Sequence, residues 1–571
     1  MNTLKIRILC QPLPVVQSLQ AVTCRVFQER AWPTPEFLSG PGPADLEWDL
    51  VSGIAPQGFR IETGAAGQVR IVANDAQGLF YGMGKFLRRT RLNDGELILC
   101  PWRGTSVPRL SMRGIYFATH FHNFYQEAPI EKVETYIEDL ALKGFNALNV
   151  WFDMHHFKGI DDPAAQVMLT RLKALLRTAR RVGMSAGIGF LANEGYRTTP
   201  SALRASPTGR AHYGVEVCVA TPEGEALVLE NFRGELNAFR EVGLDFIWFW
   251  PYDQGGCACP ACGPWGRKGM LKIGEKLARL FRESFPGGKV VFSTWLFDYG
   301  KDQGEWAGLA QAFSTKPVWA DYLLADSHDR FPRFPLEQGV PGGLPLLNFP
   351  EISMYGMLPW GGFGANPLIQ RFSSLWGEVA HVADGGFPYS EGIFEDLNKA
   401  AYSHFYWTGQ NDCREALDEY FEFEFGATDL EGCRKILDLL EANHGPCWMV
   451  GDMVRKWGSP AGGIPLSDYP EGSVRFSRSH ADHARAEEAL TLCRRIELSL
   501  PEWGRKSWRW RIIALRVLLD HELLKNGDQP TETCQRAFLE LQDIYCAEKG
   551  EAAVSPPLKN VNRIDDSANC D

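Results

Sequence analysis

Side chains able to exchange protons recur directly after short apolar runs in the middle of the chain. The set, which also includes an amide and an indole, is His120, His122, Asp153, Glu194, Asp253, Gln254, Trp295, Asp321, Glu351 and Glu391. Two carboxyl groups held together can protonate a leaving group and stabilise, or deliver water to, the carbon that it leaves. Histidine and aromatic side chains add hydrogen bonds and flat apolar surfaces. The residue types therefore indicate acid–base chemistry, provided that the fold gathers them in one place.

Eight apolar runs precede these residues and predict the fold that gathers them. The runs occupy residues 114–117, 147–151, 186–190, 246–250, 290–294, 318–321, 346–349 and 386–389. They lack the polar alternation of half-exposed strands, and most of the stretches between them have helical periodicity. Eight buried parallel strands with crossover helices form a (β/α)8 barrel, whose strand ends face the active site. We therefore predict the α/β fold class, with a catalytic barrel over residues 108–405.

Two regions of different character flank the predicted barrel. Residues 1–107 combine strand and helix patterns and predict a small N-terminal α/β domain. Residues 406–571 carry apolar residues at three- and four-residue spacing and predict an α-helical C-terminal domain. The expected C-terminal helices span residues 414–425, 429–443, 477–498, 508–526 and 532–547.

Asp253 is the first candidate for a catalytic acid. It follows the fourth apolar run, in a segment that ends in Gly255 and Gly256. Neighbouring Trp and Tyr rings would desolvate its carboxyl group and raise the pKa, as a general acid requires, although a turn aspartate can also bond its own backbone. Cleavage of a glycosidic bond needs a second carboxylate, and Glu351 and Asp321 are our candidates for base or stabiliser. Each of these carboxylates has an alternative role in a cap or an ion pair.

The remaining strand-end residues are predicted to bind substrate. His120 and His122 follow the first run, and histidines there can bond hydroxyl groups or bind a metal. We prefer hydroxyl contacts, because the His120-Phe121-His122 pair is not combined with a carboxylate in a pattern that indicates a metal site. The same binding role is predicted for Asp153, Glu194, Gln254, Trp295 and Glu391.

One cluster stands out among the 14 cysteines. Cys257, Cys259 and Cys262 lie within six residues, directly after the Asp253 segment. Three thiols at this spacing can bind a structural zinc ion if a fourth ligand comes from elsewhere, and the metal would stiffen the loop beside Asp253. The second CxxC pair of a typical zinc site is absent from the sequence, so a disulfide and free thiols are the alternatives.

The composition of the chain limits the classes of partner that it can bind. The 571 residues carry a net charge of -11, which provides no basic field for nucleic acid. No apolar stretch approaches the roughly 20 residues of a membrane helix, and we find no signal peptide pattern, so we predict a cytoplasmic protein without a membrane partner. We expect a carbohydrate substrate, no required cofactor, and a possible homo-oligomer formed through the helical domain.

Several motifs resemble a known group of enzymes over about residues 50 to 425. Residues 58–61, 69–75 and 78–82 are similar to the small α/β domain that precedes the barrel in family 20 β-hexosaminidases and family 67 α-glucuronidases. The run Met112-Arg113-Gly114 resembles the start of the hexosaminidase barrel, where the matching arginine binds sugar hydroxyls, so the resemblance makes Arg113 a substrate contact. Residues 390–399 are similar to uncharacterised bacterial glycosidases of this architecture.

The resemblance implies an exo-acting glycoside hydrolase, with β-N-acetylhexosaminidase-like activity as our first hypothesis. One departure is that family 20 enzymes have an aspartate followed by the acid glutamate after the fourth strand, whereas this chain has Asp253 and Gln254. Glutamine cannot donate a catalytic proton, so either Asp253 is the acid or the acid is Glu194, Glu351 or Glu391. An inverting α-glucuronidase-like enzyme and a sugar-binding barrel that lost its acid are the alternatives, and a metal-dependent lyase or isomerase is a third class.

Overall fold

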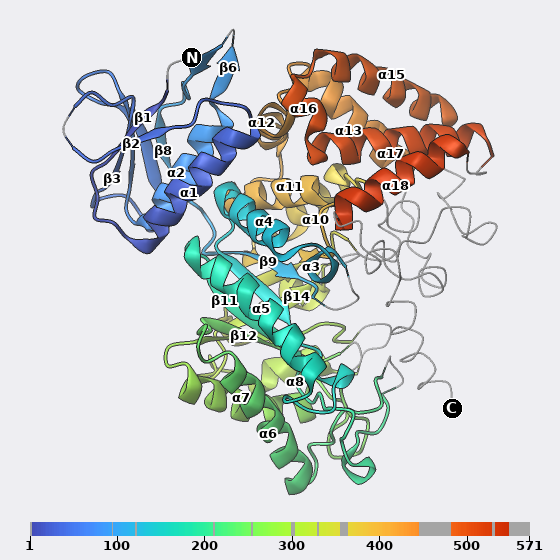
Figure 1. Ribbon diagram of the computed structural model, residues 1–571. Coiled ribbons are helices and arrows are strands. Elements are labelled where there is room, and N and C mark those ends of the chain that lie inside the picture. The colour runs from blue at the N-terminus through green and yellow to red at the C-terminus, as the bar shows by residue number, and fades with distance from the viewer. Residues whose placement is uncertain are drawn as a thin grey trace.

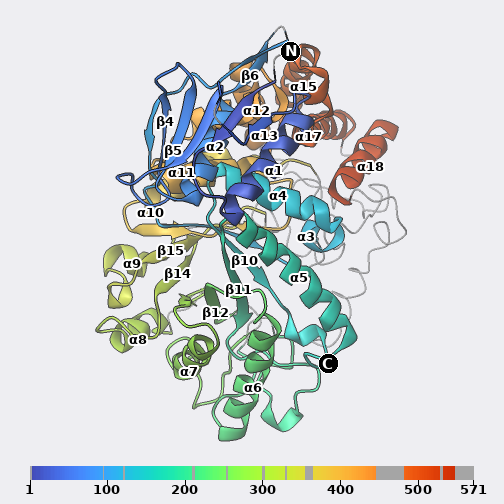
Figure 2. The same cartoon turned by 60° about the vertical axis from the view of Figure 1, so that its left-hand side comes forward.

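The computed structural model describes residues 3–40, 42–93, 95–119, 123–208, 212–252, 255–298, 303–327, 331–353, 364–444, 481–527 and 531–546. Figures 1 and 2 show a central barrel, with a sheet-containing N-terminal region in blue and a bundle of C-terminal helices in orange and red. Both flanking regions lie at the same end of the view in Figure 1, above the green half of the barrel.

The N-terminal region is a mixed sheet with helices packed on it. Its strand order is β2-β1-β3-β5-β4-β8, and only β4 pairs antiparallel with its neighbours. The strands are β1 (Lys5–Ile8), β2 (Glu36–Leu38), β3 (Leu46–Leu50), β4 (Phe59–Thr63), β5 (Val69–Ala73) and β8 (Gly104–Ser106), with a separate hairpin of β6 (Arg91–Asn93) and β7 (Glu96–Ile98). Two helices, α1 (Pro14–Glu29) and α2 (Ala76–Arg88), complete the region. The Asp75 carboxylate accepts a hydrogen bond from Gly78 N and caps α2.

Eight parallel strands close into the barrel among the described residues, as predicted, although the eighth apolar run (386–389) shares only Gly386 with the eighth barrel strand. They are β9 (Met112–Phe117), β10 (Ala147–Trp151), β11 (Ser185–Leu191), β12 (Phe246–Trp250), β13 (Lys289–Ser293), β14 (Tyr322–Asp326), β15 (Leu346–Phe349) and β16 (Ala383–Gly386). Each pairs in parallel with the next, and β16 pairs with β9 to close the cylinder. A short strand, β17 (Tyr389–Ser390), continues the pairing along β9. The strands are buried on both faces, which explains their continuous apolar character.

Helices surround the barrel and run back from its carboxyl end to its amino end. They are α3 (Phe124–Glu127), α4 (Ile130–Lys143), α5 (Pro163–Arg181), α6 (Pro222–Ala238), α7 (Gly269–Ser284), α8 (Glu305–Ala312), α9 (Arg333–Glu337), α10 (Ile369–Val379) and α11 (Asp396–Thr408), with 3-10 turns η1 (Met154–His156), η2 (Ser201–Leu203) and η3 (Pro341–Gly343). Asp162 caps α5 and Thr221 caps α6, and each of these helices has proline in its first turn.

The sixth strand begins later than the sequence predicts. The expected strand at residues 318–321 is wrong, because β14 spans Tyr322–Asp326. Val318 is 89% exposed, and Trp319 instead packs edge-on against Phe292 and Phe313 in the layer outside the barrel. The apolar run is therefore longer than the strand, and its first part covers the barrel wall.

The C-terminal helices pack together and against the other two regions. They are α12 (Arg414–Phe425), α13 (Leu430–His444), α15 (His483–Ser499), α16 (Glu502–Lys506), α17 (Trp508–Lys525) and α18 (Glu532–Cys546). None of the helices in the described part of the chain is both long and apolar enough to cross a membrane.

Buried ion pairs join the three regions. The network consists of Arg25, Arg30, Asp139, Lys143, Asp396, Glu424 and Arg509. Arg509 of α17 is at its centre, with its guanidinium nitrogens 2.7 Å from Asp139, 2.9 Å from Asp396 and 3.3 Å from Glu424. These residues lie in α1, α4, α11, α12 and α17 or, for Arg30, directly after α1, so the network fixes the flanking regions on the barrel.

Candidate active site

Four carboxylates follow strands at the carboxyl end of the barrel and are buried there. Asp153 follows β10, Glu194 follows β11, Glu351 follows β15 and Glu391 follows β17. The carboxyl ends of barrel strands carry the catalytic groups in this fold. The positions predicted for these four residues from the apolar runs therefore agree with their positions in the structure.

Glu391 is a buried carboxyl group held by defined partners. The Tyr389 hydroxyl donates to Glu391 Oε1 at 2.7 Å, and the backbone N–H of Glu391 donates to Ser353 Oγ at 2.8 Å and to Glu395 Oε1 at 3.0 Å. Burial raises the pKa of Glu391 to about 8, although the Tyr389 hydrogen bond acts in the opposite direction. Glu391 is therefore protonated at neutral pH and can donate a proton or a hydrogen bond.

Glu351 lies on the neighbouring strand end. It forms an isolated parallel bridge with Tyr389, next to the bond of 2.8 Å from Tyr389 N to Pro350 O. Side chains two residues apart on a strand share a face, so Glu351, Tyr389 and Glu391 lie on one face of this extension. The rings of Tyr116 and Phe349 pack against Tyr389, which identifies that face as the barrel interior.

Asp153, His155 and Glu194 form a second group across β10 and β11. One ligand atom from each lies within 4.8 Å of the others, and His155 Nδ1 is 2.9 Å from Glu194 Oε1. Burial and then the Asp153 charge raise the pKa of Glu194 well above its usual range. Tyr213 stacks on the His155 ring with 3.4 Å between centroids. This group is able to bind a cation or to share a proton.

Aromatic rings line the barrel below these carboxylates. Trp250 is half-buried and stacks on Trp295 with ring centroids 5.2 Å apart and an interplanar angle of 28°. Trp151 meets Trp250 edge-on at 6.0 Å, and Phe349 contacts Trp250 at 5.0 Å. Flat apolar surface beside buried carboxyl groups suits the face of a pyranose ring.

The structure contradicts the predicted role of Asp321. Because β14 begins at Tyr322, Asp321 lies before the strand, at the amino end of the barrel. Its carboxylate pairs with Arg282 Nη2 at 2.7 Å and Lys289 Nζ at 3.1 Å, and it accepts from Val290 N at 2.9 Å. Asp321 therefore fixes the base of the barrel, and Asp326 occupies the carboxyl end of this strand.

Arg113 is also far from the carboxyl end. It is the second residue of β9, is fully buried, and donates to Gly144 O at 2.9 Å, Leu110 O at 2.8 Å and Gln57 Oε1 at 2.6 Å. Its guanidinium lies over the rings of Tyr81 and Trp407. Arg113 therefore joins the barrel base to the N-terminal region, and the substrate contact implied by the resemblance is wrong.

Four of the predicted site residues lie outside the described residues. These are His120, His122, Asp253 and Gln254. Asp253 as the catalytic acid and the other three as substrate contacts stay predictions.

The three clustered cysteines come together with a fourth. Cys257, Cys259 and Cys262 meet Cys218, which precedes α6, and one sulfur from each lies within 4.8 Å of the others. All four are free thiols, and Cys218 Sγ is 3.7 Å from Cys259 Sγ.

Two tyrosines that sequence reasoning missed hold Glu391 in place. Tyr389 lies two residues before Glu391, and its hydroxyl donates a hydrogen bond to the Glu391 carboxyl group. Tyr545 in α18 donates to Glu391 O at 2.9 Å and accepts from Phe124 N at 2.8 Å. The alternation of side chains along a strand could have placed Tyr389 on the same face as Glu391. No local pattern, however, links Tyr545 to a strand end 154 residues earlier.

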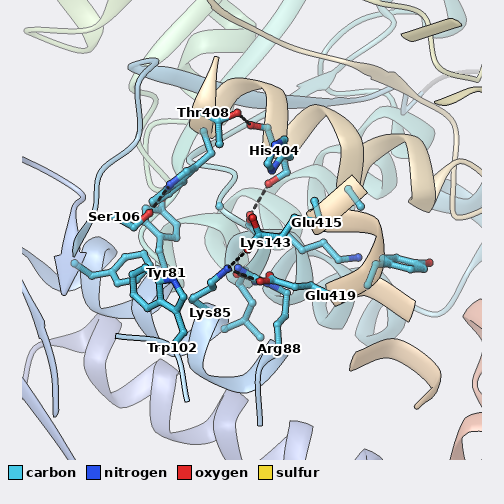
Figure 3. Close-up of a pocket in the computed structure, with 18 of the residues that line it drawn as sticks. Tyr81, Lys85, Arg88, Trp102, Ser106, Lys143, His404, Thr408, Glu415 and Glu419 are labelled. Carbon is cyan, nitrogen blue, oxygen red and sulfur yellow. Dashed lines mark hydrogen bonds and ion pairs between the residues drawn. The ribbon is translucent and has the colours of Figure 1, made fainter. Parts of the chain in front are cut away.

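A separate cavity of about 260 Å³ lies between the N-terminal region and helices α11 and α12 (Figure 3). Lys85 and Arg88 of α2 both pair with Glu419 along its wall, and Trp102 and His404 also line it. Its lining lacks the strand-end carboxylates, so we locate the candidate site at the carboxyl end of the barrel.

Neither a protein-family model nor a curated protein matches the chain. Solved structures do match. A family GH115 4-O-methyl-α-glucuronidase with specificity for decorated arabinogalactans has a TM-score of 0.60 and 11% identity, over 99% of this chain and 80% of that one. A Clostridium perfringens GH89 enzyme, solved with GlcNAc-α-1,4-galactose, has a TM-score of 0.60 and 14% identity, over 93% and 64%.

A GH20 β-N-acetylhexosaminidase from Streptomyces coelicolor A3(2) also matches, with a TM-score of 0.52 and 15% identity, over 73% of this chain and 90% of that one. At these identities the matches establish the fold. They confirm the predicted barrel architecture and its resemblance in shape to glycoside hydrolases.

Proposed function

We propose that this protein is an exo-acting glycoside hydrolase that removes a terminal uncharged sugar, with β-N-acetylhexosaminides as the first substrate class. The observation that carries the proposal is Glu391, a buried carboxyl group with a pKa of about 8 at the carboxyl end of the barrel. A carboxyl group that keeps its proton at neutral pH can protonate a glycosidic oxygen. Glu351, on the adjacent strand end, is the partner carboxylate for the anomeric carbon.

The local charge supports an uncharged sugar over a glucuronide. Within five residues beyond the end of each barrel strand, the described residues include no lysine or arginine. Among these described residues, a substrate carboxylate placed beside the buried carboxyl groups of Asp153, Glu194 and Glu351 would therefore find no lysine or arginine to pair with. The rings of Trp250 and Trp295 supply the apolar surface on which a neutral pyranose stacks.

The test is hydrolysis of 4-nitrophenyl glycosides, with β-N-acetylhexosaminides, glucuronides and neutral hexosides in parallel. Glu391→Gln keeps the size and hydrogen bonds of the side chain but cannot deliver a proton, so kcat/KM falls by about 10²–10⁴-fold. Glu283→Gln, at an exposed position of α7, is the matched control and keeps full activity. No turnover and no sugar binding by the wild-type protein across the panel would refute the proposal.

A second substrate series separates proton donation from simple binding. Dinitrophenyl glycosides have a leaving group that needs no protonation, so they restore most of the rate if Glu391 is the acid. An equal loss on both series would make Glu391 a sugar contact. Asp253→Asn, assayed in the same way, tests the acid predicted from the sequence.

A further inference from the structure

We propose that four cysteines bind one zinc ion as thiolates: Cys218, Cys257, Cys259 and Cys262. Their sulfur atoms lie within 4.8 Å of one another, although Cys218 precedes α6 and the others precede α7. Zinc binds four cysteines at about 2.3 Å in a tetrahedron, which places neighbouring sulfurs about 3.8 Å apart. The 3.7 Å between Cys218 Sγ and Cys259 Sγ matches that edge.

A disulfide explains this geometry poorly. Bonded sulfurs lie about 2.05 Å apart, whereas all four cysteines here are free thiols. The backbone around Cys259 also forms a tight turn, in which Cys262 N and Gly263 N donate to Cys259 O at 3.0 and 2.8 Å. That turn points two thiols at spacing C-x2-C toward one centre, as structural zinc sites require.

Neighbouring groups offset the charge of such a site. Zinc with four thiolates has a net charge of -2, since each thiol releases its proton on binding. Lys268 Nζ donates to Pro260 O at 3.3 Å and Lys272 Nζ to Val219 O at 2.8 Å, so one ammonium group lies beside each ligand segment. The Ser206 N–H points at Cys257 Sγ at 3.4 Å, as N–H groups do around metal-bound sulfur.

The ion would act as a positioning element for the candidate active site. The Asn193 side chain donates to Val217 O and to Gly256 O, both at 3.0 Å, and accepts from Gly256 N at 2.9 Å. Val217 and Gly256 each directly precede a cysteine ligand. A metal bound to both Cys218 and Cys257 would therefore hold in place the two backbone segments that bond to the side chain of Asn193, the residue next to Glu194.

The experiment measures metal in the intact chain, independently of any activity. The protein is produced in zinc-supplemented medium, purified without chelator and analysed by elemental mass spectrometry and X-ray absorption. We expect one zinc per chain with four sulfur neighbours at about 2.3 Å. Cys218→Ser removes one ligand at nearly constant volume and lowers the zinc content and Tm, whereas Cys24→Ser, a half-buried cysteine of α1, leaves both unchanged.

A measurement on the wild-type chain covers the case in which Cys218→Ser does not fold. Titration with a mercurial that modifies thiolates should release the zinc, detected with a colorimetric chelator. Wild-type protein without stoichiometric zinc, iron in its place, or a disulfide within the cluster by mass spectrometry would each overturn the assignment.

Discussion

Buried carboxylates occur in two places in this molecule, and their surroundings are opposite. In the ion network between the three regions, Asp139, Asp396 and Glu424 all contact Arg509. Burial alone would raise the pKa of Asp396, but Lys143, Arg509 and Lys399 hold it well below the usual range. At the barrel mouth, burial raises the pKa of Glu391 and Glu194, and the neighbours of Glu194 add negative charge.

The difference separates groups that fix the fold from groups that can react. A carboxylate surrounded by cations stays ionised and holds its partners in place. A buried carboxyl group without a cation keeps its proton near neutral pH, which is the state that acid catalysis needs. Glu235 of α6 extends the second set, since burial and then the charges of Glu194 and Asp153 raise its pKa well above the usual range.

The largest effect should come from breaking the ion network. Arg509→Met leaves three buried carboxylates without their shared cation and should lower the free energy of unfolding by about 3–5 kcal/mol. Urea denaturation measures this loss, with Arg414→Met as the control because that side chain is 77% exposed. Equal small losses in both variants would show that Arg25, Arg30 and Lys143 suffice to stabilise the network.

The two regions should also respond to pH with opposite sign. Glutamate has an ordinary pKa of 4.5, and that of Glu391 is about 8, so its proton stabilises the fold below pH 4.5 and this contribution is lost as the pH rises to about 8. Asp396 has a lowered pKa, so its contribution is present above its ordinary value of 3.8 and is lost in acid below it.

The Glu391 contribution is measurable as a difference between two proteins. Glu391→Gln should be more stable than the wild type at pH 8.5 by roughly 4 kcal/mol relative to their difference at pH 4.5. Thermal unfolding of both across this range checks the slope. An unchanged difference would mean that Glu391 titrates near its ordinary pKa and would remove the main support for an acid role.

Two tryptophans distinguish binding from stability. Trp250→Ala removes the half-buried ring that stacks on Trp295 and should raise KM about tenfold, which corresponds to a loss of about 1.4 kcal/mol of binding free energy. Trp508→Ala removes the ring under Arg509, whose guanidinium carbon lies 4.2 Å from the ring centroid, and should lower Tm without raising KM. Steady-state kinetics and thermal unfolding of both variants would show whether the two readouts separate.

The smallest effect should come from single hydroxyl groups. Tyr545→Phe removes the hydrogen bonds to Glu391 O and Phe124 N and should lower kcat several-fold, in line with about 1 kcal/mol. Tyr420→Phe removes a bond of 2.8 Å to Asp396 in the ion network and should affect stability alone. A kcat loss in Tyr420→Phe as large as that in Tyr545→Phe would refute the separation.

Sequence reasoning located most of the elements because burial leaves a clear pattern. The runs at residues 147–151, 246–250 and 346–349 coincide with β10, β12 and β15, and α12 has the predicted bounds. The sixth strand is an exception, because the apolar residues from 318 to 325 belong partly to the layer outside the barrel and partly to the strand itself. Asp321 therefore lies at the amino end of this strand and not at its carboxyl end.

The site was harder to predict because its contacts are distant in sequence. Glu351 and Glu391 could be found from strand ends, but Cys218 lies 41 residues before Cys259 and carries no spacing signal of its own. Arg113 shows the limit of a motif resemblance, since the same short run fits a substrate contact or, as here, a contact with Gln57 of another region.

The bond from Tyr545 to the Glu391 backbone has a consequence for how the protein is made. Synthesis produces the barrel before the helix that contacts its mouth, and 154 residues separate the two bonded positions. The strands can pair while those residues are still being added. The bond that Tyr545 donates to Glu391 O can form only after α18 has been synthesised and docks beside α3.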